Sequence, residues 1–393
     1  MPADPHGAVG RRIAYHRRVT RLTQQKLADA ANIHVGTLRK IERGARGVGD
    51  GVLEALATAM RIDPAVLLAD RAQTGSRVQQ SLPALSAVIA AYDLPDDGPV
   101  RSLPLLRSAV RDTVNWRLAA QYVQISRHLP DLLAELLRAR HTVPGHQRSE
   151  IAALLVSACR SADAVAYKFG AYDLSARLIE LMRWAGPQAD DNVLNTTIAY
   201  VRTETFFAAG THKRGLHALE IAIDAAPPPD RAPAVVARGA LHMRAAVLAG
   251  RAGVADAADT HLAEARRLGD QVPEGVYTGT AFGPSSVRIH EVSVAVSLGG
   301  DRVQRALKVA RGWAPPQELP DERRSGFYIE LARAQLWAGL PDGAFESLRN
   351  ARRIAPQHTR DHLWVREDVA ILRRLKRSDA ESLSSFAKWC HAT

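Results

Sequence analysis

The lysine and arginine side chains near the N-terminus are the residues of this sequence with the clearest chemistry. Residues 1–46 hold ten of them against three acidic residues, in a chain of 393 residues with a formal net charge of +11 and a pI near 10.0. The much longer remainder therefore adds little net charge. Positive charge concentrated at one end suggests a polyanionic partner there, although basic faces exposed only to water would give the same composition.

Three of these cations, Arg39, Lys40 and Arg43, stand close together in the stretch VGTLRKIER. On a helix that begins near His34 they occupy outward positions. Their donors suit N7 and O6 of guanine in the major groove of a duplex, and they equally suit phosphate oxygens. For Arg39 the two kinds of contact remain open alternatives. His34 is expected at the surface or against a phosphate backbone.

The apolar pattern around these cations is interrupted at Ala31-Asn32-Ile33 and then resumes. A single amphipathic helix would keep one stripe at intervals of three and four residues, so we expect two short helices that meet at an angle. Thr23 is a suitable N-cap for the first helix, and Asn32 tolerates the left-handed conformation that a sharp turn requires. The apolar residues expected between the two helices are Leu27, Ala28, Ala31, Ile33, Leu38 and Ile41.

The stretch RRIAYHRRVTRLTQQKLADAANIHVGTLRKIERG, followed by GVLEALATAMRIDPAVLLAD, resembles the five-helix helix-turn-helix domain of Cro/C1-type (XRE-family) repressors over about residues 8–70. The resemblance implies that the second helix of the pair enters the major groove of double-stranded DNA. It also implies phosphate-backbone contacts for Gln24 and Arg43. The DNA-binding residues that it implies are Thr23, Gln24, His34, Val35, Gly36, Thr37, Arg39, Lys40 and Arg43.

The base-reading positions depart from the usual pattern of this family. Val35 and Gly36 occupy two of these positions and Lys40 occupies the third. Val35 can contact a thymine methyl group, whereas Gly36 offers no side chain. Direct recognition of bases is therefore expected to depend on Arg39 and Lys40.

Beyond residue 71 the sequence predicts an all-α chain, with a polar linker at residues 72–81 and helical hairpins over residues 82–393. Strand signals are almost absent, and small turns recur before an alanine at intervals of about 40 residues. This period is typical of an α-solenoid. The recurring alanines are Ala176, Ala218, Ala258, Ala306 and Ala344.

The segment FYIELARAQLWAGLPDGAFESLRNARRIAP resembles a tetratricopeptide repeat, in which Pro356 ends the second helix. A Cro/C1-type domain joined to tetratricopeptide-like repeats is similar to the peptide-sensing transcription regulators of bacteria. The resemblance implies a homodimer that binds a palindromic operator and senses a peptide or small molecule. The alternative is a scaffold in which the repeats recruit a protein partner to DNA.

One segment of the repeat region could hold such a ligand. In TAFGPSSVRIHEV an aromatic residue, a helix start at Pro284 and an arginine lie close together, and such a site could receive a carboxylate or carbonyl group. A capped helix with a half-buried arginine would explain the same pattern. The candidate ligand-binding residues are Phe282, Ser285, Arg288 and His290.

Catalytic and metal-binding patterns are incomplete, so we expect no enzyme, no metal and no cofactor. HEVSV at His290 lacks the second histidine of the zinc-protease motif, and HTRDH at His358 and His362 lacks its glutamate. Only two cysteines occur and no long apolar run is present, which favours a reducing compartment and no membrane span. The expected location is the cytoplasm, in association with the nucleoid.

Overall fold

The computed structural model describes residues 5–20, 22–60, 62, 67, 73–375, 380–390 and 392. The chain divides into two compact units, Met1–Ser76 and Arg77–Thr393. The all-α prediction is confirmed, because the described residues are helical apart from turns and one short hairpin. Helix α6 (Gln73–Ala90) includes most of residues 72–81, and the boundary between the two units falls within this helix, after Ser76.

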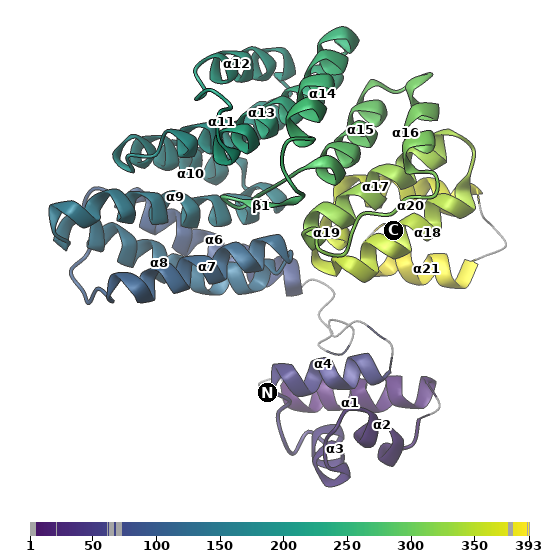
Figure 1. Ribbon diagram of the computed structural model, residues 1–393. Coiled ribbons are helices and arrows are strands. Elements are labelled where there is room, and N and C mark those ends of the chain that lie inside the picture. The colour runs from purple at the N-terminus through teal and green to yellow at the C-terminus, as the bar shows by residue number, and fades with distance from the viewer. Residues whose placement is uncertain are drawn as a thin grey trace. The chain divides into compact units, whose positions relative to one another are not determined.

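The N-terminal unit contains four described helices around one apolar core (Figure 1). These helices are α1 (Pro5–Val19), α2 (Gln24–Ala30), α3 (Val35–Glu42) and α4 (Asp50–Ala59). Leu27, Leu38 and Leu56 are fully buried in this core, one from each of α2, α3 and α4. Of the expected fifth helix after Asp63 the structure describes only Leu67, which is fully buried in this core.

The bend between α2 and α3 has the predicted cause. Asn32 adopts a left-handed conformation with φ of 51°, which turns the chain sharply. The hydroxyl of Thr23 accepts a hydrogen bond from the amide of Lys26 at 3.1 Å and caps the start of α2. At the start of α3, Nδ1 of His34 accepts from the amide of Gly36 at 3.1 Å. Both helices therefore begin with a side-chain cap, and the helix-turn-helix prediction is confirmed.

Helix α1 packs very closely against the end of α3. A Cβ atom added to Gly10 would lie 2.0 Å from the carbonyl oxygen of Ile41 and 3.0 Å from that of Glu42. Only a glycine permits this approach. The orientation of α3 is therefore fixed by the bend at one end and by contact with α1 at the other.

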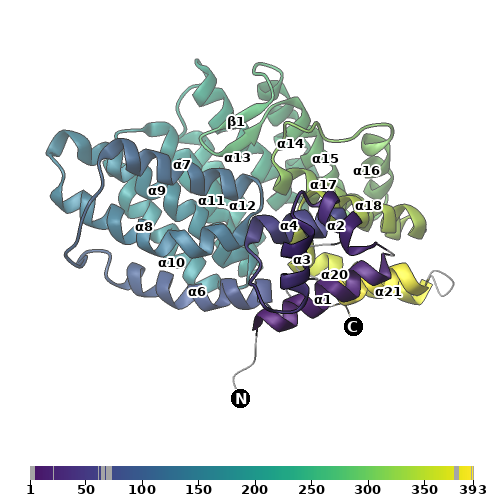
Figure 2. The same ribbon diagram turned by 90° about the horizontal axis from the view of Figure 1, so that it is seen from below.

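The C-terminal unit is a series of antiparallel helical hairpins that follow one another in space (Figures 1 and 2). No helix of the described residues is long and apolar enough to cross a membrane. The C-terminal unit begins within α6 and continues with α7 (Leu103–Leu118), α8 (Tyr122–Thr142), α9 (Gly145–Lys168), α10 (Tyr172–Ala185), the 3-10 helix η1 (Gly186–Gln188), α11 (Asn192–Ala208), α12 (His212–Asp224), α13 (Ala232–Arg251) and α14 (Ala255–Gly269). The chain continues with β1 (Gly275–Tyr277), β2 (Thr280–Phe282), α15 (Pro284–Leu298), α16 (Arg302–Ala310), α17 (Asp321–Trp337), α18 (Pro341–Ile354), α19 (Pro356–Asp361), α20 (Leu363–Leu375) and α21 (Ala380–Trp389).

The recurring small residues fall on the second helix of each hairpin, as the period predicts. Three of the five alanines are fully buried there: Ala258, Ala306 and Ala344. Ala176 and Ala218 are only half-buried, and the enclosed small residues of their helices are Ser175 and Gly215. A Cβ atom at Gly215 would lie 2.8 Å from Cβ of Phe206 on the preceding helix. The period was thus correct, and in two hairpins the enclosed small residue is a neighbour of the recurring alanine or lies three positions before it.

The last complete hairpin, α17 with α18, matches the tetratricopeptide-like prediction. Ala332 on α17 and Ala344 on α18 are completely buried in one apolar cluster. Helix α18 ends at Ile354, and Pro356 then opens α19. Proline suits the first turn of a helix, where its missing N–H has no partner to lose. Pro356 therefore both ends one helix and starts the next.

The hairpin of β1 and β2 was not expected from the sequence. Its strands pair antiparallel, with Val276 opposite Ala281 and Tyr277 opposite Thr280. The turn residues Thr278 and Gly279 both have positive φ, of 47° and 71°. Strands of three residues are too short to give a clear alternating pattern, and contacts from distant helices hold this hairpin in place, as described below.

Candidate nucleic-acid interface and a charged cavity

Helix α3 separates an apolar face from a basic one. Leu38 and Ile41 are buried in the core of the N-terminal unit, whereas Arg39, Lys40 and Arg43 are exposed. The guanidinium Nε of Arg43 donates to the carbonyl oxygen of Arg39 at 3.2 Å, at the end of the helix. The three predicted cations therefore stand on the open side of α3, as the sequence pattern required.

A network of charged and amide side chains fixes α3 to α1 and α2. Arg17 on α1 forms an ion pair with Glu42 at 2.7 Å, with both side chains largely buried. Gln24 donates through Nε2 to the Glu42 carboxylate at 2.7 Å and accepts from Nε of Arg39 at 3.4 Å. The Gln24 amide thus holds α2 to α3 and orients Arg39. The phosphate contact that the resemblance assigns to Gln24 stays a prediction.

The predicted DNA-binding residues at the start of α3 are not all exposed to solvent. His34 is exposed, and its Nδ1 caps the helix. A Cβ atom at Gly36 would lie only 3.0 Å from this Nδ1, so the glycine leaves room for the cap. Val35 is half-buried against the apolar core, and Thr37 is half-buried as well. Exposed donors on this helix therefore belong mainly to Arg39, Lys40 and Arg43.

The C-terminal unit contains a cavity of about 300 Å³ on the side formed by the first helix of each hairpin. Helices α7, α9, α11, α13, α15 and α17 all contribute side chains to it. Its cationic residues are Arg117, Arg160, Lys168, Arg244, Arg251 and Arg323. Its acidic residues are Asp163, Glu204, Glu322 and Glu330. A lining of this kind is unusual, because ligand pockets are mostly apolar with a few polar groups.

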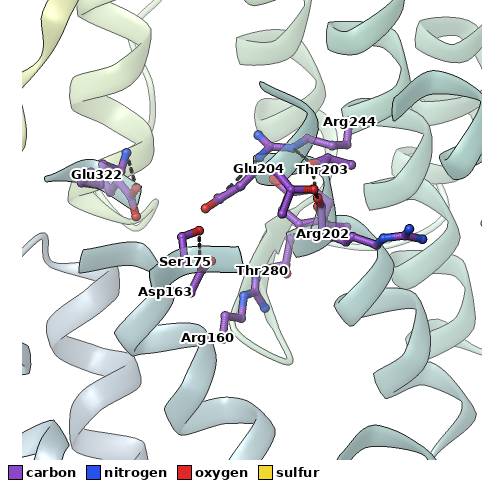
Figure 3. Close-up of polar contacts among 12 residues, drawn as sticks. Arg160, Asp163, Ser175, Arg202, Thr203, Glu204, Arg244, Thr280 and Glu322 are labelled. Atoms are coloured by element: carbon purple, nitrogen blue, oxygen red, sulfur yellow. Dashed lines mark hydrogen bonds and ion pairs between the residues drawn. The ribbon is translucent and has the colours of Figure 1, made fainter. Parts of the chain in front are cut away.

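Some of these charges neutralise one another across the cavity (Figure 3). Lys168 on α9 forms an ion pair with Glu322 on α17 at 2.7 Å, and Arg244 lies 3.5 Å from Glu204. Burial raises the pKa of Glu322, but the charge of Lys168, its hydrogen bond and further charges nearby together outweigh burial and lower this pKa to about 2. The first of these pairs joins segments that are far apart in the sequence.

Burial disfavours the charged forms of two other titratable groups in the cavity, His290 and Asp163. Burial lowers the pKa of His290 to about 3, and Arg323 adds to this effect. Burial raises the pKa of Asp163 well above its usual range, and the nearby Glu204 raises it further. Asp163 accepts a hydrogen bond from Ser175 at 2.5 Å. The His290 ring therefore adds no positive charge to the cavity, and burial disfavours the charged form of Asp163.

The four predicted ligand-binding residues do not form one site. His290 lines the cavity, but Phe282 is fully buried, and its ring would clash with any side chain at Gly239. Arg288 donates to the carbonyl oxygen of Val309 at 2.7 Å and stacks on Trp313. Ser285 is half-buried and lines no part of the cavity. Arg288 is half-buried, as in the alternative explanation, whereas the N-cap residue Gly283 offers no side-chain cap, and the Glu274 carboxylate accepts a hydrogen bond from the amide of Ser286 at 2.9 Å.

The sequence did contain a signal for the cavity that the pattern analysis missed. Arg160 and Asp163 interrupt the otherwise small and apolar run SACRSADAVAY of α9. Charged residues three positions apart share a helical face, so such a pair within an apolar run indicates a buried polar site. The other side chains of the cavity could not be found this way, because they lie on six other helices, α7, α11, α13, α15, α17 and α19.

The histidines of HTRDH take part in the same cavity. Nδ1 of His358 lies 2.7 Å from the Ser325 hydroxyl, and its Nε2 lies 3.1 Å from Nζ of Lys168. The His362 ring stands next to that of His358, with ring centres 5.5 Å apart. Across the described residues, no three His, Cys, Asp or Glu side chains are arranged to hold a metal ion.

Comparison with known proteins identifies the N-terminal unit. Residues 21–67 match the family model described as Helix-turn-helix. No curated protein matches the chain. Among solved structures, the chain is similar to PlcR of Bacillus thuringiensis, solved in complex with the peptide PapR7 and DNA. That alignment has 14% sequence identity and a TM-score of 0.31, and covers 67% of this chain and 95% of PlcR.

The chain is also similar to a mutant of PrgX, with 8% identity and a TM-score of 0.25, over 96% of this chain and 99% of PrgX. Alignments with such low scores assign no role to any residue of this chain. The family match over residues 21–67 is supported by the structure, because the bend, the helix caps and the exposed cations of that segment are all present. The N-terminal unit of this chain is therefore a helix-turn-helix domain of the Cro/C1 type.

Proposed function

We propose that this protein is a sequence-specific DNA-binding transcription regulator that inserts α3 into the major groove. The observation that carries the proposal is the presentation of α3 in a helix-turn-helix domain: Asn32 bends the chain, and Arg39, Lys40 and Arg43 stand on the exposed face. Residues near the start of the second helix face base edges in this docking geometry.

The exposed side chains divide into two roles. Lys40 and Arg39 contact base edges, where their donors match N7 and O6 of guanine. Arg43, at the C-terminal end of α3, contacts a phosphate, which adds affinity without sequence information. Orientation of Arg39 by the Gln24 amide supports a base contact for it, because readout requires a fixed donor direction.

A homodimer on a palindromic operator forms part of the proposal. Helix α3 has eight residues, which corresponds to a length of about 12 Å. One such helix spans only a few base pairs, so a single copy reads a short sequence. Two copies related by a two-fold axis place their recognition helices in half-sites about one helical turn apart, and this doubles the information that is read.

The C-terminal unit is proposed to sense a ligand, which we take to be a small molecule or peptide. Its support is the charged cavity on the face formed by the first helices of the hairpins. A scaffold that only recruits a partner protein has no need to enclose so many charged groups. Such groups are costly to bury without a function or a partner.

Selection of DNA sites from a random library, followed by footprinting with the full chain, tests the proposal. We expect one palindromic sequence to emerge. Lys40→Ala should weaken binding to that site by about 1–3 kcal/mol and relax base preference at one position of each half-site. Arg43→Ala should weaken binding to all sequences alike and reduce its salt dependence. Arg349→Ala, at an exposed arginine of α18, is the matched control and should change neither property.

Two results would count against the proposal. Binding that depends on salt but not on sequence would favour the scaffold, which needs DNA only as a tether. Equal losses for Lys40→Ala on selected and random DNA would show that Lys40 contacts phosphate alone.

A further inference from the structure

Two arginines on the inner helices of the C-terminal unit are buried without a carboxylate partner. Nη2 of Arg117 on α7 donates to the carbonyl oxygen of Gly279 at 2.8 Å. Arg160 on α9 donates to the carbonyl oxygen of Thr278 at 2.9 Å and to the hydroxyl of Thr280 at 2.7 Å. Within the described residues, no carboxylate lies at ion-pair distance from either guanidinium group. Both are bonded only to neutral acceptors of the β1–β2 hairpin.

A third guanidinium group, that of Arg323 on α17, lines the same cavity. Its Nη1 lies 3.2 Å from Nε2 of His290, and its Nη2 lies 3.5 Å from the hydroxyl of Tyr200. Nδ1 of His290 donates to the carbonyl oxygen of Ser286 at 2.8 Å, so the neutral ring accepts the bond from Arg323. Arg323 is also without a carboxylate at ion-pair distance in the part of the chain that the structure describes.

Burial makes this arrangement costly for the unliganded protein. Arg117 and Arg160 are only 7% and 8% exposed. Nε of Arg117 has no hydrogen-bond partner among the described residues. Buried charges are normally paired, because water no longer solvates them. Burial lowers the pKa of Arg160 to about 9, with the neighbouring Arg117 contributing to the same effect.

The acidic residues of the cavity do not provide the missing charge. Glu322 is paired with Lys168, and Glu204 is paired with Arg244. Glu330 accepts a hydrogen bond from Ser293, and burial raises the pKa of its carboxyl group. An anion from solution is therefore the remaining source of charge for the three arginines.

We propose that the cavity binds a compact anion, whose carboxylate or phosphate group is held by Arg117, Arg160 and Arg323. Carboxylate and phosphate oxygens both match the planar donor fork of a guanidinium group. The volume of about 300 Å³ lies at the lower limit for ligand sites and fits a small molecule. This inference rests on the proposed sensor function and names the chemical class of its effector.

The three arginines lie on different helices, so an anion bound to all of them would connect these helices. Arg117 and Arg160 hold the hairpin turn, and Arg323 lies on α17, near the other end of the unit in the sequence. One bound anion would join helices α7, α9 and α17. Binding therefore stabilises the arrangement of hairpins around the cavity, because a ligand that binds only the folded state stabilises it more as the ligand concentration rises.

Thermal unfolding of the full chain without DNA tests this inference. Citrate and inorganic phosphate are the probes, each compared with chloride at equal ionic strength. We expect the unfolding midpoint to rise with the concentration of at least one probe. A response to citrate alone identifies the carboxylate class, and a response to phosphate alone identifies the phosphate class. The absence of any rise with either probe would overturn the proposal.

Variants separate a site from a general salt effect. Arg160→Gln should remove most of the rise in the unfolding midpoint. Arg323→Gln should also remove most of it, and this second variant tests the site if Arg160→Gln does not fold. Arg202→Gln is the matched control, because Arg202 lies on α11 and points away from Arg160 (Figure 3). It should keep the full rise. An equal rise in the wild type and in both cavity variants would overturn the proposal.

The readout also distinguishes a binding role from a structural one. If Arg160 only holds the hairpin, Arg160→Gln should lower the midpoint without anion and leave the anion-dependent rise intact, which would contradict the inference. Failure of the DNA-binding proposal is seen separately, in the Lys40→Ala experiment, and does not alter the response to anions.

Discussion

Tyr200 shows how strongly the charges of the cavity act on a single residue. Its side chain is 7% exposed and lies on α11. Burial opposes ionisation of the phenol, but the guanidinium groups of Arg323 and Arg244 outweigh burial and lower its pKa to about 8. Tyr167, on the neighbouring α9, has its pKa raised to about 12, chiefly by burial. Two phenols in one cavity are thus driven in opposite directions.

Titration of the full chain, followed by the ultraviolet absorbance of phenolate, should resolve this difference. We expect one phenol to ionise near pH 8, and Tyr200→Phe should remove that step. Because the folded pKa is lowered, the ionised phenol adds stability that is fully present above pH 10 and is lost as the pH falls to about 8. A titration with no step before pH 10 would contradict the described environment.

At the scale of elements, the geometry of the interface depends on the contact between α1 and α3. Gly10 allows α1 to approach the carbonyl groups of Ile41 and Glu42. The ion pair of Arg17 with Glu42 joins the same two helices. The exposed cations keep their direction only while this contact is intact.

Gly10→Ala should lower the free energy of unfolding of the N-terminal unit by about 1–3 kcal/mol, because the added methyl group would overlap a backbone carbonyl group. DNA affinity should fall with it. Gly51→Ala on α4 is the matched control, since a Cβ atom there meets nothing within 4 Å. Urea unfolding followed by circular dichroism measures both changes. Equal stabilities for the two variants would show that α1 and α3 are not in close contact.

For the molecule as a whole, the two units differ in their buried histidines. The described histidines with a lowered pKa all lie in the C-terminal unit, and burial is the first cause for each. They are His212, His242, His261, His290, His358 and His362. For His290 and His362 the pKa is lowered to about 3 from a usual 6.5. Between pH 6.5 and about 3, these two histidines therefore bind protons in the unfolded chain but not in the folded unit.

Acid should consequently destabilise the C-terminal unit. Between pH 6.5 and about 3, its stability should fall as the pH falls, since protonation favours the unfolded state. Asp163 and Glu330 act in the opposite direction, because their pKa values are raised. The decisive measurement is thus the difference between wild type and His290→Gln in calorimetry across this range, and the variant should show the smaller slope. Identical slopes would show that His290 is accessible to protons in the folded state.

The features that could be predicted correctly from the sequence depend on local interactions. The bend at Asn32, the cap by Thr23 and the exposed face of Arg39, Lys40 and Arg43 depend on residues within about twenty positions of one another. The hairpin period also follows from neighbours in the chain. These features could be derived because turns, caps and helical faces are set by spacing along one segment.

Tertiary structure alone decided the rest. Residues 73–81 are polar in composition, yet they belong to a helix that continues into the C-terminal unit. The β1–β2 hairpin is held by Arg117 and Arg160, which lie more than a hundred residues before it. The charged cavity is assembled from one helix of each successive hairpin, and only packing of the hairpins brings those side chains together. Contacts between distant residues leave no periodic trace in a sequence, because each helix carries only its own part of the site.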